Sequence, residues 1–279
     1  MAHDHISHFR LIAYTRLARI RPTIVSAWLK KLLRLPRVQT RSELGNFWLD
    51  PVSHLGQTLL HGKIHEPSTV QALQAVLSEG NTFIDLGSNE GYFSIIASAL
   101  VGNTGRVYAI EPQRRLQMVL QKNIELNGAR NIVIRRCAIS NQAGKANLYL
   151  SPNTNTGSSG FYRATRYGNW KETVETETLD AFFQRERISS CDLLKIDIEG
   201  HEYEAIFGST DIFRSGAIKA VVLEIHREIL KRRGLAAEKI TDFLADCGYC
   251  LDERFAETSM WIRGAPFRNK EGLTIDGEQ

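Results

Sequence analysis

The chain has 279 residues, of which 43% are hydrophobic and 24% are charged, with a formal net charge of +4. This length and composition predict one large domain with a substantial core plus an appendage, and they exclude intrinsic disorder. Residues 1–45 contain nine basic and two acidic residues, a net +7, so the other 234 residues carry −3. A mildly acidic body argues against nucleic-acid binding, because phosphate contacts need a basic surface.

Nothing in the amino-terminal region has the length of an apolar membrane span or the pattern of a signal peptide. The four cysteines form no dense framework, which indicates a reducing compartment: Cys137, Cys191, Cys247 and Cys250. We therefore expect a cytoplasmic protein. The last two cysteines have the spacing of a redox or zinc motif, but no second pair accompanies them, so a structural role is favoured.

The spacing of apolar residues predicts two basic amphipathic helices, over residues 8–20 and from Pro22 to Leu33. Their apolar stripes consist of Phe9, Ile12, Ala13, Leu17 and Ile20, and of Ile24, Val25, Trp28, Leu29, Leu32 and Leu33. Such helices can lie on an anionic membrane, which would place residues 8–35 on the inner membrane face. We favour docking on the large domain or on a second subunit, because a stripe beside charges is the usual surface-helix pattern.

From residue 80 onward, predicted strands alternate with helices. The strands are expected near 82–86, 106–111, 131–137, 146–150, 173–178, 192–197, 218–225 and 257–263. The helices are expected near 67–78, 91–100, 113–127, 201–208 and 235–247. This alternation predicts an α/β fold with a mostly parallel sheet, helices on both faces and a ligand at the carboxyl ends of the strands. We expect an extension over 1–64, a domain over 65–263 and a tail over 264–279.

The first of these strands ends in a glycine turn of sequence Asp85-Leu-Gly-Ser-Asn-Glu-Gly91. Two glycines four residues apart, before an apolar helix, let the backbone fold tightly over a ligand. Glu111 ends the next strand and is placed to bind a ribose diol. The third glycine of the G-x-G-x-x-G pattern of dinucleotide binders is missing, so a nucleoside without phosphate fits better. S-adenosylmethionine (SAM) meets that description, and NAD fits less well.

A polar, glycine-rich segment interrupts the alternation at residues 151–160, followed by aromatic and basic residues up to Trp170. A loop of this length is usually functional or disordered. Its rings and hydrogen-bonding groups suit a sugar-like substrate, so it is either a substrate lid or a solvated hairpin tip.

Two later strands end in ionisable residues. Asp197 and Glu199 follow the strand over 192–197, and Glu224 and His226 lie two apart, which on a strand points both to the same face. Together they predict an acid/base cluster or a metal site of mixed ligands, with Mg²⁺ as an unproven possibility. For Glu202 a simple preference for a helix amino terminus is the better interpretation.

These stretches resemble the FkbM family of SAM-dependent methyltransferases over about residues 65–255. The matching motifs are Phe83-Ile-Asp-Leu-Gly-Ser-Asn-Glu-Gly-Tyr92, Gly105-Arg-Val-Tyr-Ala-Ile-Glu-Pro112, Asn123-Ile-Glu-Leu-Asn-Gly128, Glu177-Thr-Leu-Asp180, Leu194-Lys-Ile-Asp-Ile-Glu-Gly-His-Glu202 and Val222-Leu-Glu-Ile-His226. The run around Asp197 is the most distinctive. Ser88 stands where family members commonly have Ala or Val, a small change that should still permit binding.

The resemblance implies a Rossmann-like class I methyltransferase fold and O-methylation of a sugar, glycolipid, polysaccharide or secondary metabolite. It implies a cofactor site whose residues would be Asp85, Gly87, Ser88, Asn89 and Gly91 at the methionine end, Glu111 and Pro112 at the ribose, and Cys137 and Ala138 at the adenine.

A sugar hydroxyl is a poor nucleophile and needs a base or a metal as the new bond forms. We place Asp197 and His226 near the acceptor, with Glu199 and Glu224 as orienting groups or alternative bases. Two other functions stay open: a non-catalytic nucleoside-binding scaffold in a glycan-assembly complex, and an NAD-dependent oxidoreductase. An RNA methyltransferase is disfavoured by the acidic body, and an oligomer is possible.

Overall fold

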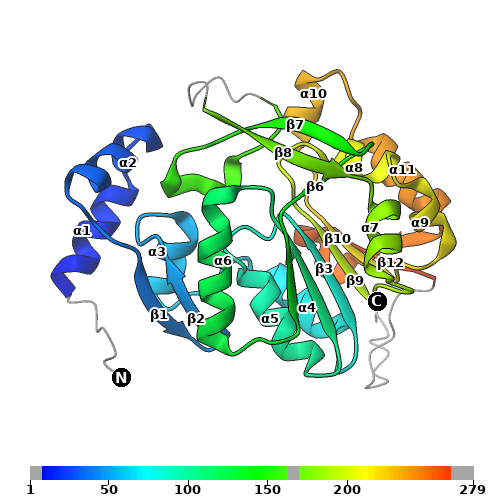
Figure 1. The fold of residues 1–279 in the computed structure, drawn as a ribbon, viewed down its shortest axis with the longest axis horizontal. Helices are drawn as coiled ribbons and strands as arrows, with labels where there is room; N and C mark the ends of the chain where they lie inside the picture. The colour runs from blue at the N-terminus through cyan, green and yellow to red at the C-terminus, as the bar shows by residue number, and fades with distance from the viewer. Residues whose placement is uncertain (1–7, 163–169, 265–279) are drawn as a thin grey trace, which may run out of the picture.

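A seven-stranded sheet forms the centre of the computed structural model, which describes residues 8–162 and 170–264 (Figure 1). Its strand order is β11-β12-β10-β9-β3-β4-β5. Five strands run parallel: β10 (Ala220–Leu223), β9 (Leu193–Ile196), β3 (Thr82–Leu86), β4 (Arg106–Ile110) and β5 (Ile132–Arg135). Two antiparallel strands, β12 (Met260–Arg263) and β11 (Tyr249–Leu251), complete one edge. The predicted α/β fold with a mostly parallel sheet is confirmed.

Helices cover both faces of this sheet, because alternate residues of each buried strand point to opposite sides. Ile84 and Leu86 pack into the core beneath α7 (Leu179–Glu186), α8 (Glu202–Phe207), α9 (Thr210–Ser215) and α11 (Glu238–Asp246). Phe83 packs on the opposite face with α4 (Pro67–Val76) and α5 (Tyr92–Val101), and Ala109 packs there against α6 (Arg114–Asn127).

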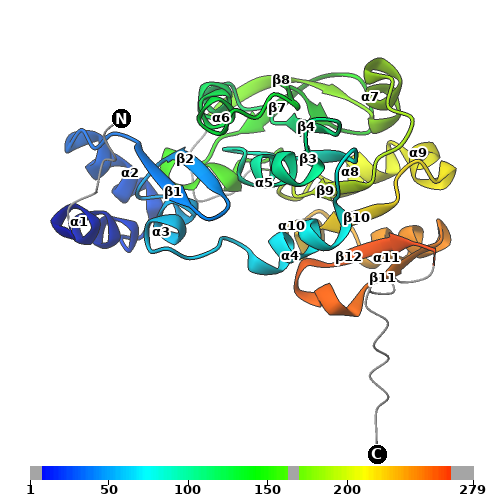
Figure 2. The same ribbon diagram turned by 90° about the horizontal axis from the view of Figure 1, so that it is seen from below.

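Two of the predicted strands do not join the main sheet. β7 (Gly144–Tyr149) and β8 (Lys171–Glu177) pair antiparallel with each other, and the short β6 (Ala138–Ile139) lies parallel to β8. This small sheet lies on the same side of the molecule as α7 (Figure 2). β7 is mostly solvated, with Leu148 as its buried residue, and a half-solvated hairpin does not need the double cover that a parallel strand requires.

Several elements were not predicted. A hairpin of β1 (Val38–Ser42) and β2 (Gly45–Leu49) precedes the short α3 (His54–Leu60), and α10 (Arg227–Arg232) follows β10. The Trp48 N–H donates to Asn123 Oδ1 at 2.6 Å, and the Asn46 N–H donates to Asn127 Oδ1 at 2.8 Å. These bonds to α6 join part of the expected 1–64 extension directly to the α/β body.

The amino-terminal helices are present as α1 (His8–Ala18) and α2 (Thr23–Leu32), at the end of the molecule far from β11 (Figure 2). They contact the rest of the chain, but not as expected. α2 buries Ser26, while Trp28 and Leu32 are each 62% exposed. The expectation that the α2 stripe docks on the large domain is therefore wrong, since the buried Ser26 lies on the side that makes that contact; docking of the stripe on a second subunit stays a prediction.

No helix in the described part of the chain is long and apolar enough to cross a membrane. The expected tail, apart from Gly264, lies outside the described residues.

Candidate active site

The chain turns sharply after β3, and the end of β9 lies directly against this turn. Gly87, Asn89 and Gly91 have positive φ angles of 83°, 49° and 86°. A Cβ on Gly87 would lie 2.0 Å from the carbonyl oxygen of Asp197, and one on Gly91 would lie 2.4 Å from Leu120 Cδ1. Glycine is therefore required at Gly87, where its lack of a side chain lets the Asp197 backbone lie against the turn, and the positive φ favours glycine at Gly91.

A cavity of about 300 Å³ lies at the carboxyl ends of β3, β4 and β9, where ligands bind in open α/β sheets. The predicted cofactor residues that line it are Gly87, Ser88, Asn89, Glu111, Pro112 and Ala138. Asp85, Gly91 and Cys137 are not among the lining residues. Cys137 is buried next to Ala138, and burial raises the pKa of its thiol. Each of these three residues is next in sequence to a residue that lines the cavity.

Asp85 is a fully buried carboxylate beneath the turn. Its Oδ2 accepts a hydrogen bond from Ser94 Oγ at 2.6 Å, and Oδ1 has no partner among the described residues. Burial raises the pKa of Asp85, although the nearby Lys195 ammonium opposes that shift. Asp85 thus links the turn to the charged groups at the end of β9.

Glu111 directly follows β4 and is 3% exposed. Its two carboxylate oxygens accept the backbone N–H groups of Asn89 at 3.0 Å and Gln113 at 2.9 Å. Burial raises the pKa of Glu111 to about 7, against the lowering effect of these bonds. Glu111 lies in the cavity wall, so the prediction of an acidic side chain at the carboxyl end of β4 is confirmed. Each of its oxygens can accept a further hydrogen bond.

The polar segment after β7 forms another wall. Residues Asn153–Ser158 make a 3₁₀-helix, and Thr156 Oγ1 donates to Asn89 Oδ1 at 3.0 Å. Arg115 fastens the segment by donating to the Ser151 carbonyl at 2.7 Å and to Ser159 Oγ at 3.0 Å. Residues 154–159 and Phe161 line the cavity. The remainder of the predicted lid, with Arg163, Arg166 and Tyr167, lies outside the described residues.

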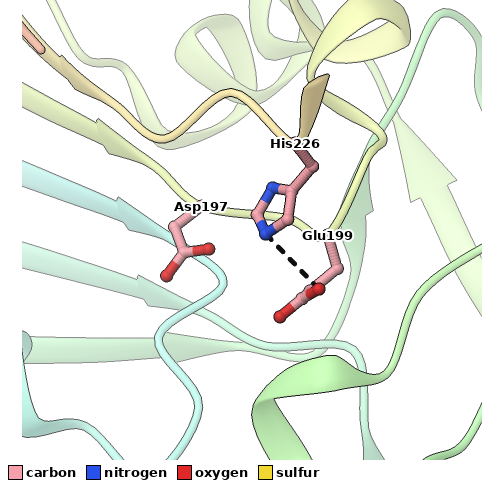
Figure 3. A group of neighbouring side chains, drawn as sticks. All are labelled: Asp197, Glu199 and His226. Atoms are coloured by element: carbon pink, nitrogen blue, oxygen red, sulfur yellow. Dashed lines mark ion pairs between the residues drawn. The ribbon is translucent and has the colours of Figure 1, made fainter. Parts of the chain in front are cut away.

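The acidic residues and the histidine predicted at the strand ends come together beside this cavity (Figure 3). His226 Nε2 lies 3.4 Å from Glu199 Oε2 and 3.9 Å from Glu224 Oε1. Asp197 accepts a hydrogen bond from Lys195 Nζ at 3.0 Å. One ligand-type atom from each of Asp197, Glu199 and His226 lies within 4.8 Å of the others. The cysteines take no part in any such group within the described residues.

The reason given for the pairing of Glu224 with His226 needs correction. β10 ends at Leu223 and α10 begins at Arg227, so neither residue is on a strand. Glu224 has a half-exposed side chain, whereas that of His226 is 17% exposed. The backbone leaves the extended conformation at His226 (φ −79°, ψ 69°), and this turn, not strand alternation, directs the imidazole toward Glu199.

Proton affinities in the cluster are perturbed. Burial lowers the pKa of His226, but the hydrogen bond to Glu202 and the charge of Glu199 outweigh burial and raise that pKa to about 9. Burial raises the pKa of Glu199 to about 8, despite the opposing charge of His226. At neutral pH the pair therefore holds at least one proton, as expected at a site of proton transfer.

Two residues of this site were missed from the sequence. Glu202 is fully buried; its Oε1 lies 2.8 Å from His226 Nδ1 and accepts the Gly200 N–H at 3.0 Å. Glu202 is the first residue of α8, as its preference for a helix amino terminus predicted, and its side chain also orients the His226 ring. Lys195 is buried, and its ammonium lies 4.9 Å from the Phe93 ring. The sequence feature that could have identified Lys195 as a site residue is its position in the otherwise apolar run 193–196.

A second cavity, of about 410 Å³, adjoins the first. The residues common to both are Glu66, Lys195, Asp197 and Glu224. Arg227, Thr258 and Ser259 add polar groups to its wall. Asp197 and Glu224 thus lie where the two spaces meet, whereas Glu199 lines the first cavity alone and His226 lines neither.

The parallel sheet, the glycine turn and the acidic residue after β4 define a Rossmann-like class I methyltransferase fold. The family model described as "Methyltransferase FkbM domain" matches residues 85–251. The chain belongs to this family, in agreement with the resemblance seen in its motifs. A model of protein-L-isoaspartate O-methyltransferases also matches residues 25–141.

Curated relatives are distant. The "Hexuronic acid methyltransferase AglP" of Haloferax volcanii is 25% identical over 161 residues, which cover 58% of this chain and 62% of that protein. A protein-L-isoaspartate O-methyltransferase of Methanosarcina mazei is 29% identical over 111 residues, covering 38% and 44%. The chain therefore spans less than two thirds of the length of either. Among solved structures, a "Methyltransferase FkbM" from Methylobacillus flagellatus is 18% identical, with a TM-score of 0.41 over 66% of this chain and 43% of that one.

Proposed function

We propose that this protein is a SAM-dependent methyltransferase that methylates a hydroxyl group of a sugar, glycolipid, polysaccharide or secondary metabolite. The observation that carries the proposal is the line of contacts from Glu202 through His226 to Glu199, which ends beside the cavity at the glycine turn. The hexuronic acid methyltransferase among the relatives supports a sugar acceptor.

The cavity fits SAM in its chemistry. Glu111 would accept hydrogen bonds from the ribose hydroxyls, and Ala138, Ile139 and Phe161 offer apolar surface for the adenine. Asp197 and Glu199 line the same space and offer carboxyl oxygens as hydrogen-bond acceptors for the polar groups of the cofactor. SAM supplies a methyl group that is already activated by its bond to a sulfonium, so the protein has to position the acceptor and remove its proton.

His226 is the base in this account. Glu202 accepts a hydrogen bond from the Nδ1–H group, which leaves Nε2 facing Glu199, a residue of the cavity wall. A carboxylate that orients a histidine and stabilises its protonated form is a recurrent arrangement in acid/base catalysis. Glu199 and Glu224, on the Nε2 side, would orient the acceptor or serve as alternative bases.

Asp197 has a separate role in the proposal. Its carboxylate is held by the Lys195 ammonium at 3.0 Å, and its backbone packs on Gly87. It is fixed at the junction of the two cavities, where an acceptor hydroxyl would meet the cofactor. We assign it to positioning of the acceptor.

The test is methyl transfer measured as release of S-adenosylhomocysteine, with glucuronic acid and its glycosides as first acceptors. The account expects turnover by the natural sequence, and loss of turnover with retained SAM binding in His226→Gln. Glu228→Gln is the matched control, because Glu228 is exposed on the adjacent α10. SAM binding without transfer to any acceptor tried would favour the scaffold alternative, and unchanged turnover in His226→Gln would remove His226 from the mechanism.

A further inference from the structure

The amino-terminal helices present an apolar surface to solvent. Of the eleven exposed large hydrophobic residues in the described part of the chain, seven lie between residues 9 and 33. They are Phe9, Ile12, Ile24, Val25, Trp28, Leu32 and Leu33. We call these seven residues the amino-terminal apolar surface. A concentration of this kind marks an interaction site, whereas single exposed apolar residues do not.

Attachment of the helices to the body leaves this surface uncovered. α1 buries Tyr14 and Leu17, and α2 turns Ser26 inward. Lys30 of α2 forms an ion pair with the buried Asp50. The contacts that hold the two helices therefore use other residues, and the apolar surface is available to a partner.

The charged residues of the segment that carries this surface are all of one sign. No Asp or Glu occurs between residues 8 and 42. The exposed basic residues of the segment include Arg16, Arg19, Arg21, Lys31 and Arg34. Two others form ion pairs with buried acidic residues, Lys30 with Asp50 and Arg37 with Glu90. An apolar surface bordered by exposed cations complements an anionic bilayer, where apolar side chains enter the interface and basic ones meet lipid headgroups.

The same charges disfavour a second copy of the chain as the partner. A two-fold dimer through this surface would bring like patches together, because each patch contacts its own counterpart. Five exposed cations on each copy would then meet with no acidic residue of this segment to pair with. We propose that α1 and α2 dock the protein peripherally on an anionic membrane surface.

A groove lies beside both this region and the candidate active site. A cavity of about 980 Å³ is lined by Arg19 and Arg21 at one end, and it shares Ser53, His54, Thr154 and Asn155 with the cofactor cavity. If the acceptor is a glycolipid, an extension that rests on the proposed function, its headgroup would reach the site along this groove. The docking itself does not depend on methyl transfer.

The experiment is co-sedimentation of the full chain with vesicles of phosphatidylcholine alone, or of phosphatidylcholine and phosphatidylglycerol in equal parts. The proposal expects binding to the anionic vesicles, weakened by salt, and little binding to the neutral ones. The triple variant Arg16→Gln/Lys31→Gln/Arg34→Gln should lose about a hundredfold in partitioning, and Trp28→Ser/Leu32→Ser about tenfold or more.

Matched controls are Lys239→Gln and Met118→Ser, which remove an exposed charge on α11 and an exposed apolar side chain on α6. Both should bind vesicles like the natural sequence, and all variants should keep its circular dichroism and melting temperature. No sedimentation with anionic vesicles, or equal sedimentation of natural and variant proteins, would overturn the proposal. So would a dimer seen by light scattering that Trp28→Ser/Leu32→Ser abolishes. None of these readouts measures methyl transfer, so the two proposals fail separately.

Discussion

Glu202 Oε1 lies 2.8 Å from Nδ1 of His226, and the carboxylate is fully buried, whereas the imidazole is 17% exposed. The buried partner fixes the orientation of the ring, so the other nitrogen, Nε2, is directed at Glu199. The contact joins the first residue of α8 to the residue that precedes α10. Residues at the amino-terminal ends of α8 and α10 thus together set the orientation of the His226 imidazole.

Glu202→Gln should move the pH dependence of turnover. The negative charge of Glu202 helps to raise the pKa of His226 to about 9, so a neutral glutamine lowers that pKa. A base acts only when unprotonated, and the rising limb of kcat should therefore shift to lower pH. At high pH, where His226 is unprotonated in both proteins, we expect kcat to be about 10- to 100-fold lower in the variant, because a glutamine orients the ring less well, with KM for SAM unchanged. Steady-state kinetics across pH provide the measurement, and an unshifted profile would show that Glu202 does not act through His226.

Glu111 should make the ligand-free protein less stable as pH rises. Its pKa is about 7 in the folded protein and 4.5 ordinarily. Between these values the unfolded chain releases a proton that the folded one keeps, so the free energy of unfolding falls, by about 3 kcal/mol in all. In Glu111→Gln this decline should be absent. Urea unfolding at a series of pH values tests the prediction, with the exposed Glu125→Gln as control; equal slopes in all three proteins would contradict it.

Gly87→Ala should destabilise the fold far more than Gly62→Ala. Both glycines have positive φ, 83° and 67°, so both substitutions incur about 1–2 kcal/mol of backbone strain. Only at Gly87 would the new Cβ meet a backbone oxygen, at 2.0 Å, whereas nothing lies within 4 Å at Gly62. Thermal unfolding measures the difference. Similar melting temperatures for the two variants would mean that the close approach to Asp197 is not required.

Chelation of divalent metal with EDTA should leave methyl transfer unchanged. Asp197, Glu199 and His226 lie close enough to share a cation. However, the buried ammonium of Lys195 already holds the Asp197 carboxylate, and it would repel a second cation placed there. Activity that EDTA removes and Mg²⁺ restores would instead assign this cluster to a metal.

The sequence predicted the parts of the site that follow from the order of strands and helices along the chain. The glycine turn and Glu111 lie on consecutive strands of a parallel sheet, so their meeting at one edge follows from the alternation of strands and helices. The placement of Asp197 and His226 at that edge follows in the same way, although the strand that was expected to carry His226 ends three residues earlier, at Leu223.

Relationships between distant segments were not predictable. The contact of Glu202 with His226 depends on the path of the chain after β9 and after β10, which no local pattern encodes. The spacing of apolar residues predicts that α2 has one apolar face. The same spacing occurs whether that face is covered by protein or exposed to solvent, so the sequence does not show which face is buried. The structure shows that Ser26 faces inward and Trp28 faces outward.

The most direct test of the central claim is calorimetric titration with SAM, S-adenosylhomocysteine and NAD, repeated with Glu111→Ala. We predict that the natural sequence binds both sulfur nucleosides and not NAD. Removal of the Glu111 carboxylate should weaken binding by about tenfold or more, because hydrogen bonds to a charged acceptor contribute about 1.5–3 kcal/mol each. Absence of binding to either sulfur nucleoside, or binding of NAD in their place, would contradict the account.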